Sequence, residues 1–144
     1  RGEAVESMYA VEGENKLTLP PNLYIIGTMN TADRSVGHID YAIRRRFAFV
    51  DVLPKDLSEE DGIVFDSKLF YEVSELFGTN LSPEFEKKDV QLGHSYFIDT
   101  SEEGGSMAIR LQYEIKPILL EYFKDGVLIG ENIKQKIEAL NPSI

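Results

Sequence analysis

A short apolar run that leads straight into polar and cationic side chains is the feature that most constrains the fold. Residues Leu23–Gly27 form a continuous apolar run of strand length, which is the pattern of a strand buried on both faces of a parallel sheet. Three consecutive arginines begin eleven residues after Asp33, at Arg44. Because open α/β sheets bind ligands outside the carboxyl ends of their strands, the run predicts an α/β fold with a candidate site just beyond Gly27.

The polar cluster after the run carries groups suited to phosphoryl chemistry. The amide of Asn30 can both donate and accept hydrogen bonds, so it can hold an attacking water against a terminal phosphate. Asp33 lies in the same cluster. The alternative is that Asn30–Ser35 forms an Asx-type turn whose side chains only satisfy the local backbone. The residue types alone leave both interpretations open.

The three arginines lie on a predicted short helix, Ile39–Phe47, whose apolar residues share one face. On an ideal helix Arg46 falls on that apolar face and Arg45 on its flank, whereas Arg44 points away. A guanidinium on an apolar face needs a carboxylate, a phosphate or a partner surface, and arginines near a site of phosphoryl transfer stabilise charge there. The alternative is that the helix ends by Arg45 and that all three side chains are solvated.

The rest of the chain changes from an α/β pattern to a helical one. Residues Ala48–Leu53 return to a strand pattern that ends at Pro54, and the charged segment Lys55–Gly62 follows. We therefore expect an α/β part over residues 1–54 and a mainly helical part over residues 55–144. Apolar residues at helical spacing predict helices near 69–77, 108–122 and 133–140, and Pro117 should kink or restart the second of these.

Composition excludes several classes of site. The chain has no cysteine and only two histidines, so we predict no disulfide, no thiolate chemistry and no metal site built by this chain. A net charge of −10 argues against a surface that grips nucleic acid. No apolar run approaches the roughly 20 residues that span a bilayer. We expect a cytoplasmic protein without membrane contact.

Two parts that a nucleotide hydrolase needs are missing from these 144 residues. No G-x-x-x-x-G-K-[ST] phosphate loop occurs, and no apolar strand ends in Asp-Glu to hold magnesium. The chain also opens at Arg1 rather than at a methionine. We therefore expect it to be a piece of a longer protein and to be inactive alone.

Two motifs closely resemble the AAA+ GTPase domain of McrB, the motor subunit of the methylcytosine-specific McrBC restriction system. They are Tyr24–Ser35 (YIIGTMNTADRS) and Ile39–Phe47 (IDYAIRRRF), and the segments Gly93–Phe97 and Tyr113–Phe123 are similar to the lid of that family. The resemblance implies the C-terminal half of an AAA+ P-loop NTPase core, with buried parallel strands. It also implies that a small helical lid subdomain follows.

The resemblance also assigns roles to residues of the first motif. Asn30 matches the sensor 1 asparagine, which orients the hydrolytic water near the terminal phosphate. Asp33 would help to set that water or would receive an arginine from a partner. Thr31 would lie at the nucleotide.

The cationic residues receive roles in the same way. Arg45 and Arg46 match the arginine-finger positions, which act on nucleotide held by the neighbouring subunit of a ring, while Arg44 would support the helix. Arg110, at the start of the long lid helix, is the candidate for a sensor 2 contact with nucleotide.

For the intact parent, the resemblance implies GTP or ATP with magnesium, a hexameric ring of identical subunits and an McrC-like endonuclease partner. Nucleotide is not expected to bind tightly to this chain alone, and DNA would be read by a domain further upstream. Two other functions stay open: another AAA+ ATPase that remodels proteins, like a chaperone, and a non-catalytic AAA+-derived module that binds protein.

Overall fold

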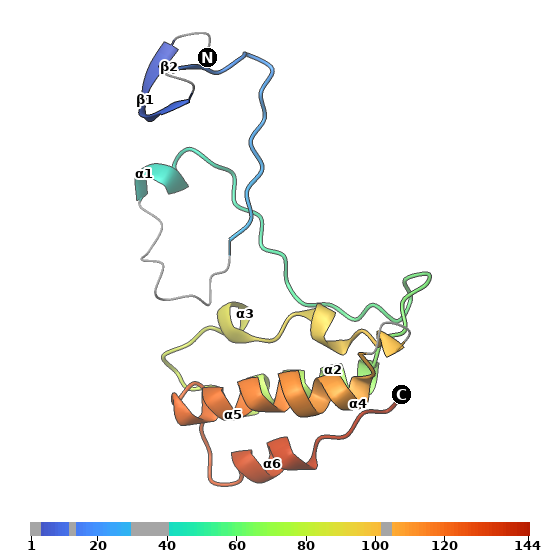
Figure 1. Ribbon diagram of the computed structural model, residues 1–144. Coiled ribbons are helices and arrows are strands. Elements are labelled where there is room, and N and C mark those ends of the chain that lie inside the picture. The colour runs from blue at the N-terminus through green and yellow to red at the C-terminus, as the bar shows by residue number, and fades with distance from the viewer. Residues whose placement is uncertain (1–3, 12–13, 30–40, 102–104) are drawn as a thin grey trace. The chain divides into compact units, whose positions relative to one another are not determined.

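The computed structural model of the chain describes residues 4–11, 14–29, 41–101 and 105–144 (Figure 1). The chain divides into two compact units, residues 1–30 and residues 31–144. No helix in the described ranges is both long and apolar enough to cross a membrane.

The first unit contains a β-hairpin. Strand β1 (Ala4–Val11) pairs with strand β2 (Glu14–Thr18) in an antiparallel sheet. Val5 lies opposite Leu17 and Glu6 lies opposite Lys16, so an apolar pair and an oppositely charged pair stabilise neighbouring rungs. The register shifts between Glu6 and Val11. The sequence analysis placed these residues in an α/β part without predicting the hairpin.

The two buried strands expected at Leu23–Gly27 and Ala48–Leu53 are not formed in this structure. Both segments are irregular, and their side chains are largely exposed, with Ile26 at 95% and Val52 at 85%. A strand exists only where a neighbouring strand takes its backbone hydrogen bonds. Within the described residues the one sheet is the antiparallel hairpin, so the apolar runs have no parallel partner.

The arginine-bearing helix is shorter than predicted. Helix α1 spans Tyr41–Arg44, and Arg45 and Arg46 lie in the turn that follows it. The predicted start at Ile39 lies outside the described residues. Because the helix ends at Arg44, the helical wheel does not determine the directions of the last two arginines.

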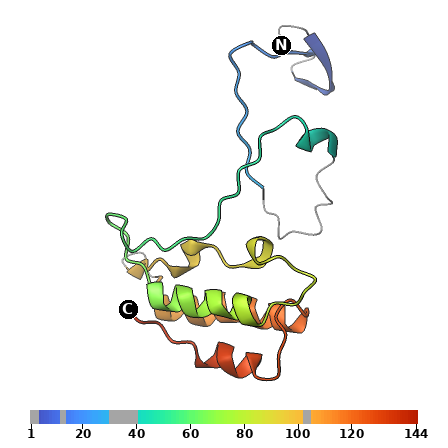
Figure 2. The ribbon, with the colours of Figure 1, turned by 180° about the vertical axis from the view of Figure 1, so that it is seen from behind.

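Most of the second unit is a cluster of helices. Helix α2 and the continuous helical stretch α4–η3–α5 lie one in front of the other in Figures 1 and 2, and α6 lies against α5. The element bounds are α2 Ser67–Thr79, α3 Lys87–Val90, η1 His94–Phe97, α4 Met107–Arg110, η3 Leu111–Ile115, α5 Lys116–Lys124 and α6 Ile133–Ala139.

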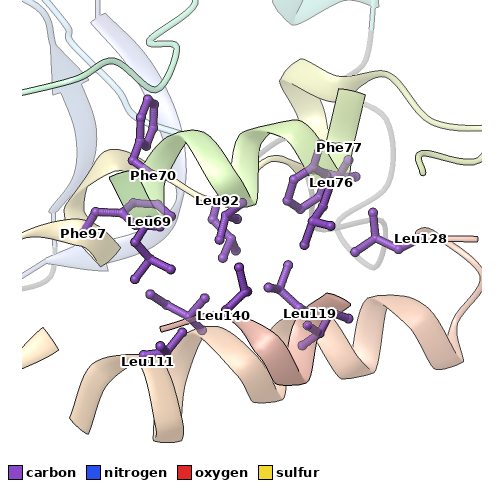
Figure 3. Close-up of a cluster of buried hydrophobic side chains, with 14 of the residues drawn as sticks. Leu69, Phe70, Leu76, Phe77, Leu92, Phe97, Leu111, Leu119, Leu128 and Leu140 are labelled. Carbon is purple, nitrogen blue, oxygen red and sulfur yellow. The ribbon is translucent and has the colours of Figure 1, made fainter. Parts of the chain in front are cut away.

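One apolar core joins these helices. The side chains of α2 meet those of the α4–η3–α5 stretch across a shared interior (Figure 3). Full burial of a leucine or phenylalanine contributes about 1.5–3 kcal/mol, so this core accounts for the stability of the helical cluster. Its fully enclosed apolar members are Leu69, Val73, Phe77, Phe97, Met107, Ile115, Leu119, Leu128, Ile133 and Ile137.

Pro117 is accommodated by a change of helix type. The predicted kink or restart takes the form of a π-helical turn, η3, directly before it. The N–H of Lys116 donates to the carbonyl of Leu111, five residues earlier. Because proline has no N–H and its ring crowds the preceding turn, the wider turn carries the helix past Pro117 without ending it.

A buried carboxylate joins three parts of the helical cluster. Asp66 is fully buried and caps α2 by accepting from the N–H of Leu69 at 3.0 Å. It also accepts from both the N–H (2.7 Å) and the hydroxyl of Ser143, 77 residues later. Its own N–H donates to the carbonyl of Phe97 at 2.9 Å. A buried charge is tolerated only when it is hydrogen-bonded in this way.

Replacing this carboxylate should therefore be costly. We expect Asp66→Ala to lower the free energy of unfolding of the helical cluster by about 3 kcal/mol, because buried N–H groups lose their acceptor. Ser143→Ala, which removes only the hydroxyl donor, should cost about 1 kcal/mol. Denaturant unfolding followed by helical circular dichroism measures both. Equal losses in the two variants would contradict this account of Asp66.

Candidate functional site

The predicted water-orienting residues cannot be placed. Asn30, Thr31 and Asp33 lie outside the described residues. Their assigned roles remain predictions from the sequence.

The three arginines form an exposed cationic group at the end of α1. Arg46 Nη1 donates to the carbonyl of Ala42 at 2.8 Å, which satisfies one of the last carbonyls of the helix. The guanidinium of Arg44 lies 5.7 Å from the centre of the Phe49 ring, within range of a cation–π contact. All three side chains are exposed. Arg45 and Arg46 are therefore accessible to an anion supplied by another molecule.

Arg110 belongs to a different group of residues, on the helical cluster. Its Nη1 donates to the carbonyls of Ser95 (2.8 Å) and Ile98 (2.7 Å). Its Nε and Nη2 donate to Glu114 Oε2 at 3.2 and 3.1 Å. Arg110 thus fastens both ends of η1 to the start of the long helix, with the ion pair to Glu114 one turn further along.

This geometry bears on the sensor 2 interpretation. All three guanidinium nitrogens of Arg110 donate within the chain, and the side chain is only 16% exposed. Four of its five N–H groups already donate to carbonyl or carboxylate acceptors, so a phosphate could take only the remaining N–H of Nη2 without displacing one of them. The structure assigns Arg110 a fastening role, and its contact with nucleotide remains a prediction.

Asp99 accepts hydrogen bonds from nearby backbone N–H groups, whereas Arg110 donates to backbone carbonyls. Its carboxylate accepts from the N–H of Met107 (2.9 Å) at the start of α4, and from the N–H (2.8 Å) and hydroxyl of Ser101. The hydroxyl of Ser101 and the two N–H groups stabilise the charged form and hold the pKa of Asp99 below its ordinary value of 3.8. A carboxylate at this position also suits the positive end of the helix dipole.

The motif Gly93–Phe97, whose Ser95 carbonyl accepts from Arg110, contains the turn η1. Phe97 is buried in the core, Ser95 is exposed, and His94 and Tyr96 are half-buried. The Nδ1 atom of His94 is buried and has no hydrogen-bond partner among the described residues. In the described ranges, no group of histidine and acidic side chains could hold a metal ion.

Sequence reasoning missed the partners of Arg110. The spacing of Arg110 and Glu114, four residues apart on a helix, is a signal for an ion pair that could have been used. No local signal indicates that the carbonyls of Ser95 and Ile98 accept from Arg110, because they lie 15 and 12 residues away in the chain.

Comparison with known proteins defines the class of the helical cluster. Residues 80–127 match the family model of the McrB α-helical lid domain. They cover α3, η1 and the whole α4–η3–α5 stretch. This part of the chain is therefore a helical lid, as the sequence predicted.

The wider comparison identifies the kind of protein. The chain is 37% identical over 142 aligned residues to the type IV methyl-directed restriction enzyme EcoKMcrB subunit of Escherichia coli (strain K12). The alignment covers 87% of this chain and 31% of that relative, and no solved structure matches. The chain is McrB-like, which confirms the resemblance found in its sequence.

The structure extends the lid beyond the matched residues. Helices α2 and α6 lie largely outside residues 80–127. Yet Leu69 and Phe77 of α2, and Ile133 and Ile137 of α6, are fully buried in the same core. The folded lid therefore includes both flanking helices.

Removing the Arg110 guanidinium should destabilise the lid. We expect Arg110→Met to lower the free energy of unfolding by about 2–3 kcal/mol, because two carbonyls and one carboxylate lose a charged donor. Glu114→Gln, which alters only the exposed pair, should cost less than about 1 kcal/mol. Denaturant unfolding of the chain compares the two. A loss below that of Glu114→Gln would show that Arg110 does not fasten the turn.

Stability should also depend on the charge of Asp99. Because its folded pKa is depressed, the contribution is present above the ordinary value of 3.8 and is lost as pH falls through the folded pKa. We expect the denaturation midpoint to fall on acidification below about pH 4, and Asp99→Asn to make this fall shallower. Equally steep acid transitions in both proteins would rule out this role.

Proposed function

We propose that this chain carries the sensor 1, arginine-finger and lid segments of an McrB-type AAA+ NTPase. The parent would be the motor subunit of a modification-dependent DNA restriction system. The observation that carries the proposal is the McrB lid preceded by the motif at Tyr24–Ser35 and the arginines at 44–46. The similarity to a methyl-directed restriction subunit supports the same function.

The exposed apolar runs fit a place inside a larger sheet. Leu23–Gly27 and Ala48–Leu53 are too apolar for a solvent-exposed coil, and Val50 and Val52 are more than four-fifths exposed. We propose that both runs become buried parallel strands of an AAA+ core when strands from the rest of the protein pair with them. The chain spans only 31% of its relative, which leaves ample length for such strands.

The chemistry assigned to this chain has two parts: orientation of the water that attacks the nucleotide, and arginines that act on the nucleotide of a neighbouring subunit. Asn30 would orient the attacking water, with Asp33 beside it, while Thr31 would lie at the nucleotide. Exposed guanidinium groups such as those of Arg45 and Arg46 stabilise charge on a phosphoryl group held by a neighbouring subunit.

The remaining parts of the machine would come from elsewhere. GTP or ATP and its magnesium would be held by a phosphate loop that these 144 residues lack. A hexameric ring would bring the arginines of one subunit to the nucleotide of the next, and an McrC-like endonuclease would be the partner. The acidic charge of the chain fits a protein, expected in the cytoplasm, that reads DNA through another domain.

The arginines provide the direct test. In the intact protein, Arg45→Ala and Arg46→Ala should each lower nucleotide turnover by about a thousandfold, because a finger stabilises charge only in the transition state. Nucleotide affinity should stay within about threefold, since ground-state binding is not their role. Phosphate release and equilibrium nucleotide binding measure the two effects.

Two controls sharpen this test. Arg44→Ala should retain most of the turnover, because Arg44 contacts Phe49 and is not assigned to the nucleotide. The 144-residue chain alone should release no phosphate. Loss of nucleotide binding as large as the loss of turnover would contradict a finger role, and so would turnover by the isolated chain.

A further inference from the structure

The charged segment before the lid packs against the lid core. Residues 55–66 follow Pro54 and precede α2, and most of their charged side chains are exposed. The composition suggests a flexible linker between two parts of the chain. The contacts made by this segment, which we call the strap, show otherwise.

Apolar anchors hold the strap at both ends. Leu57, near its start, is only 7% exposed, and Phe65, near its end, is 8% exposed. Both belong to the lid core, and Ile63 packs against that core from between them. The Phe65 ring also meets the rings of Phe70 and Phe97, with centroids 5.5 and 6.3 Å apart.

Polar contacts fix the start of the strap. Asp56 Oδ1 accepts from the N–H of Ser58 at 2.8 Å, and Lys55 Nζ lies 2.7 Å from Glu60 Oε1. The negative charge of Asp56 raises the pKa of the Tyr71 hydroxyl on α2. The exposed Lys55–Glu60 pair adds little energy by itself, so the buried side chains of Leu57 and Phe65 are the main contacts that hold the strap to the lid.

The backbone of the strap is also bonded. The N–H of Glu60 donates to Leu57 O at 3.0 Å, and the N–H of Ile63 donates to Glu60 O at 3.3 Å. Gly62 in this segment adopts a φ of +77°, a backbone conformation that residues other than glycine rarely take. Further on, the N–H of Asp99 donates to Val64 O at 2.8 Å. Asp66, the last residue of the strap, donates its N–H to the carbonyl of Phe97 at 2.9 Å, so the strap is bonded to the end of η1 and to the residues that follow it.

We propose that residues 55–66 belong to the rigid body of the lid, so that any turning of the lid of this NTPase bends the chain before Lys55 and not within the charged segment. The turning of the lid rests on the proposed function, whereas the contacts of the strap with the lid do not. A lid whose strap is fastened transmits a rotation directly to Leu53, the last residue of the proposed core strand Ala48–Leu53. A flexible segment of the same length would absorb that rotation.

Hydrogen exchange of the 144-residue chain tests the fastening. The amides of Glu60 and Ile63 should exchange at least tenfold more slowly than an unstructured peptide of the same sequence, because they open only when the strap detaches. Leu57→Ala should speed their exchange by roughly tenfold or more, while amides of α6 keep their rates. Asp56→Ala should produce a smaller acceleration in the same two amides.

Glu59→Ala is the matched control, since Glu59 is an exposed acidic residue of the strap and is not one of its buried apolar anchors. Its exchange rates should match those of the unmodified chain. Unprotected amides at Glu60 and Ile63, or no response to either Leu57→Ala or Asp56→Ala, would overturn the proposal. The experiment requires no nucleotide turnover, so failure of the strap and failure of the proposed NTPase function are observed separately.

Discussion

The buried carboxylate of Asp66 is the constraint on which the lid depends. An unpaired charge in an apolar interior is too costly to persist, so the three segments that satisfy or adjoin Asp66 must stay together. The first turn of α2 supplies Leu69, the segment after α6 supplies Ser143, and η1 ends at the carbonyl that accepts from the Asp66 N–H. Apolar packing is not directional. The hydrogen bonds of Asp66 are directional, so they fix how these three segments are placed.

Charged side chains of both signs also hydrogen-bond backbone groups in and after the Gly93–Phe97 turn. Asp99 accepts from the N–H groups of Ser101 and Met107, which follow the turn, and Arg110 donates to the carbonyls of Ser95 and Ile98. Charge-assisted hydrogen bonds of this kind are stronger than neutral ones and restrict the conformations of the bonded backbone. This explains how an irregular segment can keep a defined shape beside a regular helix. It also explains why Arg110 has little donor capacity left for a ligand.

The helices could be predicted because their signal is local. Apolar residues at a spacing of three and four predicted α2, the α4–η3–α5 stretch and α6. The contacts that orient these helices could not be predicted, since Asp66 meets Ser143 from 77 residues away. The strands at Leu23–Gly27 and Ala48–Leu53 were inferred from apolarity, which reports a preference for burial. Strand pairing also requires a neighbour, and a single segment carries no information about that neighbour.

Fold and chemistry are unevenly divided along this chain. The lid encloses its own core, so its structure follows from its own sequence. Arg45 and Arg46, the arginines assigned to catalysis, are instead exposed and follow a four-residue helix, in a region where Phe47 and Val50 also face solvent. A helix of that length is not stable in isolation. Under the proposed function, surfaces of the AAA+ core that cover these apolar residues would set the position of Arg45 and Arg46.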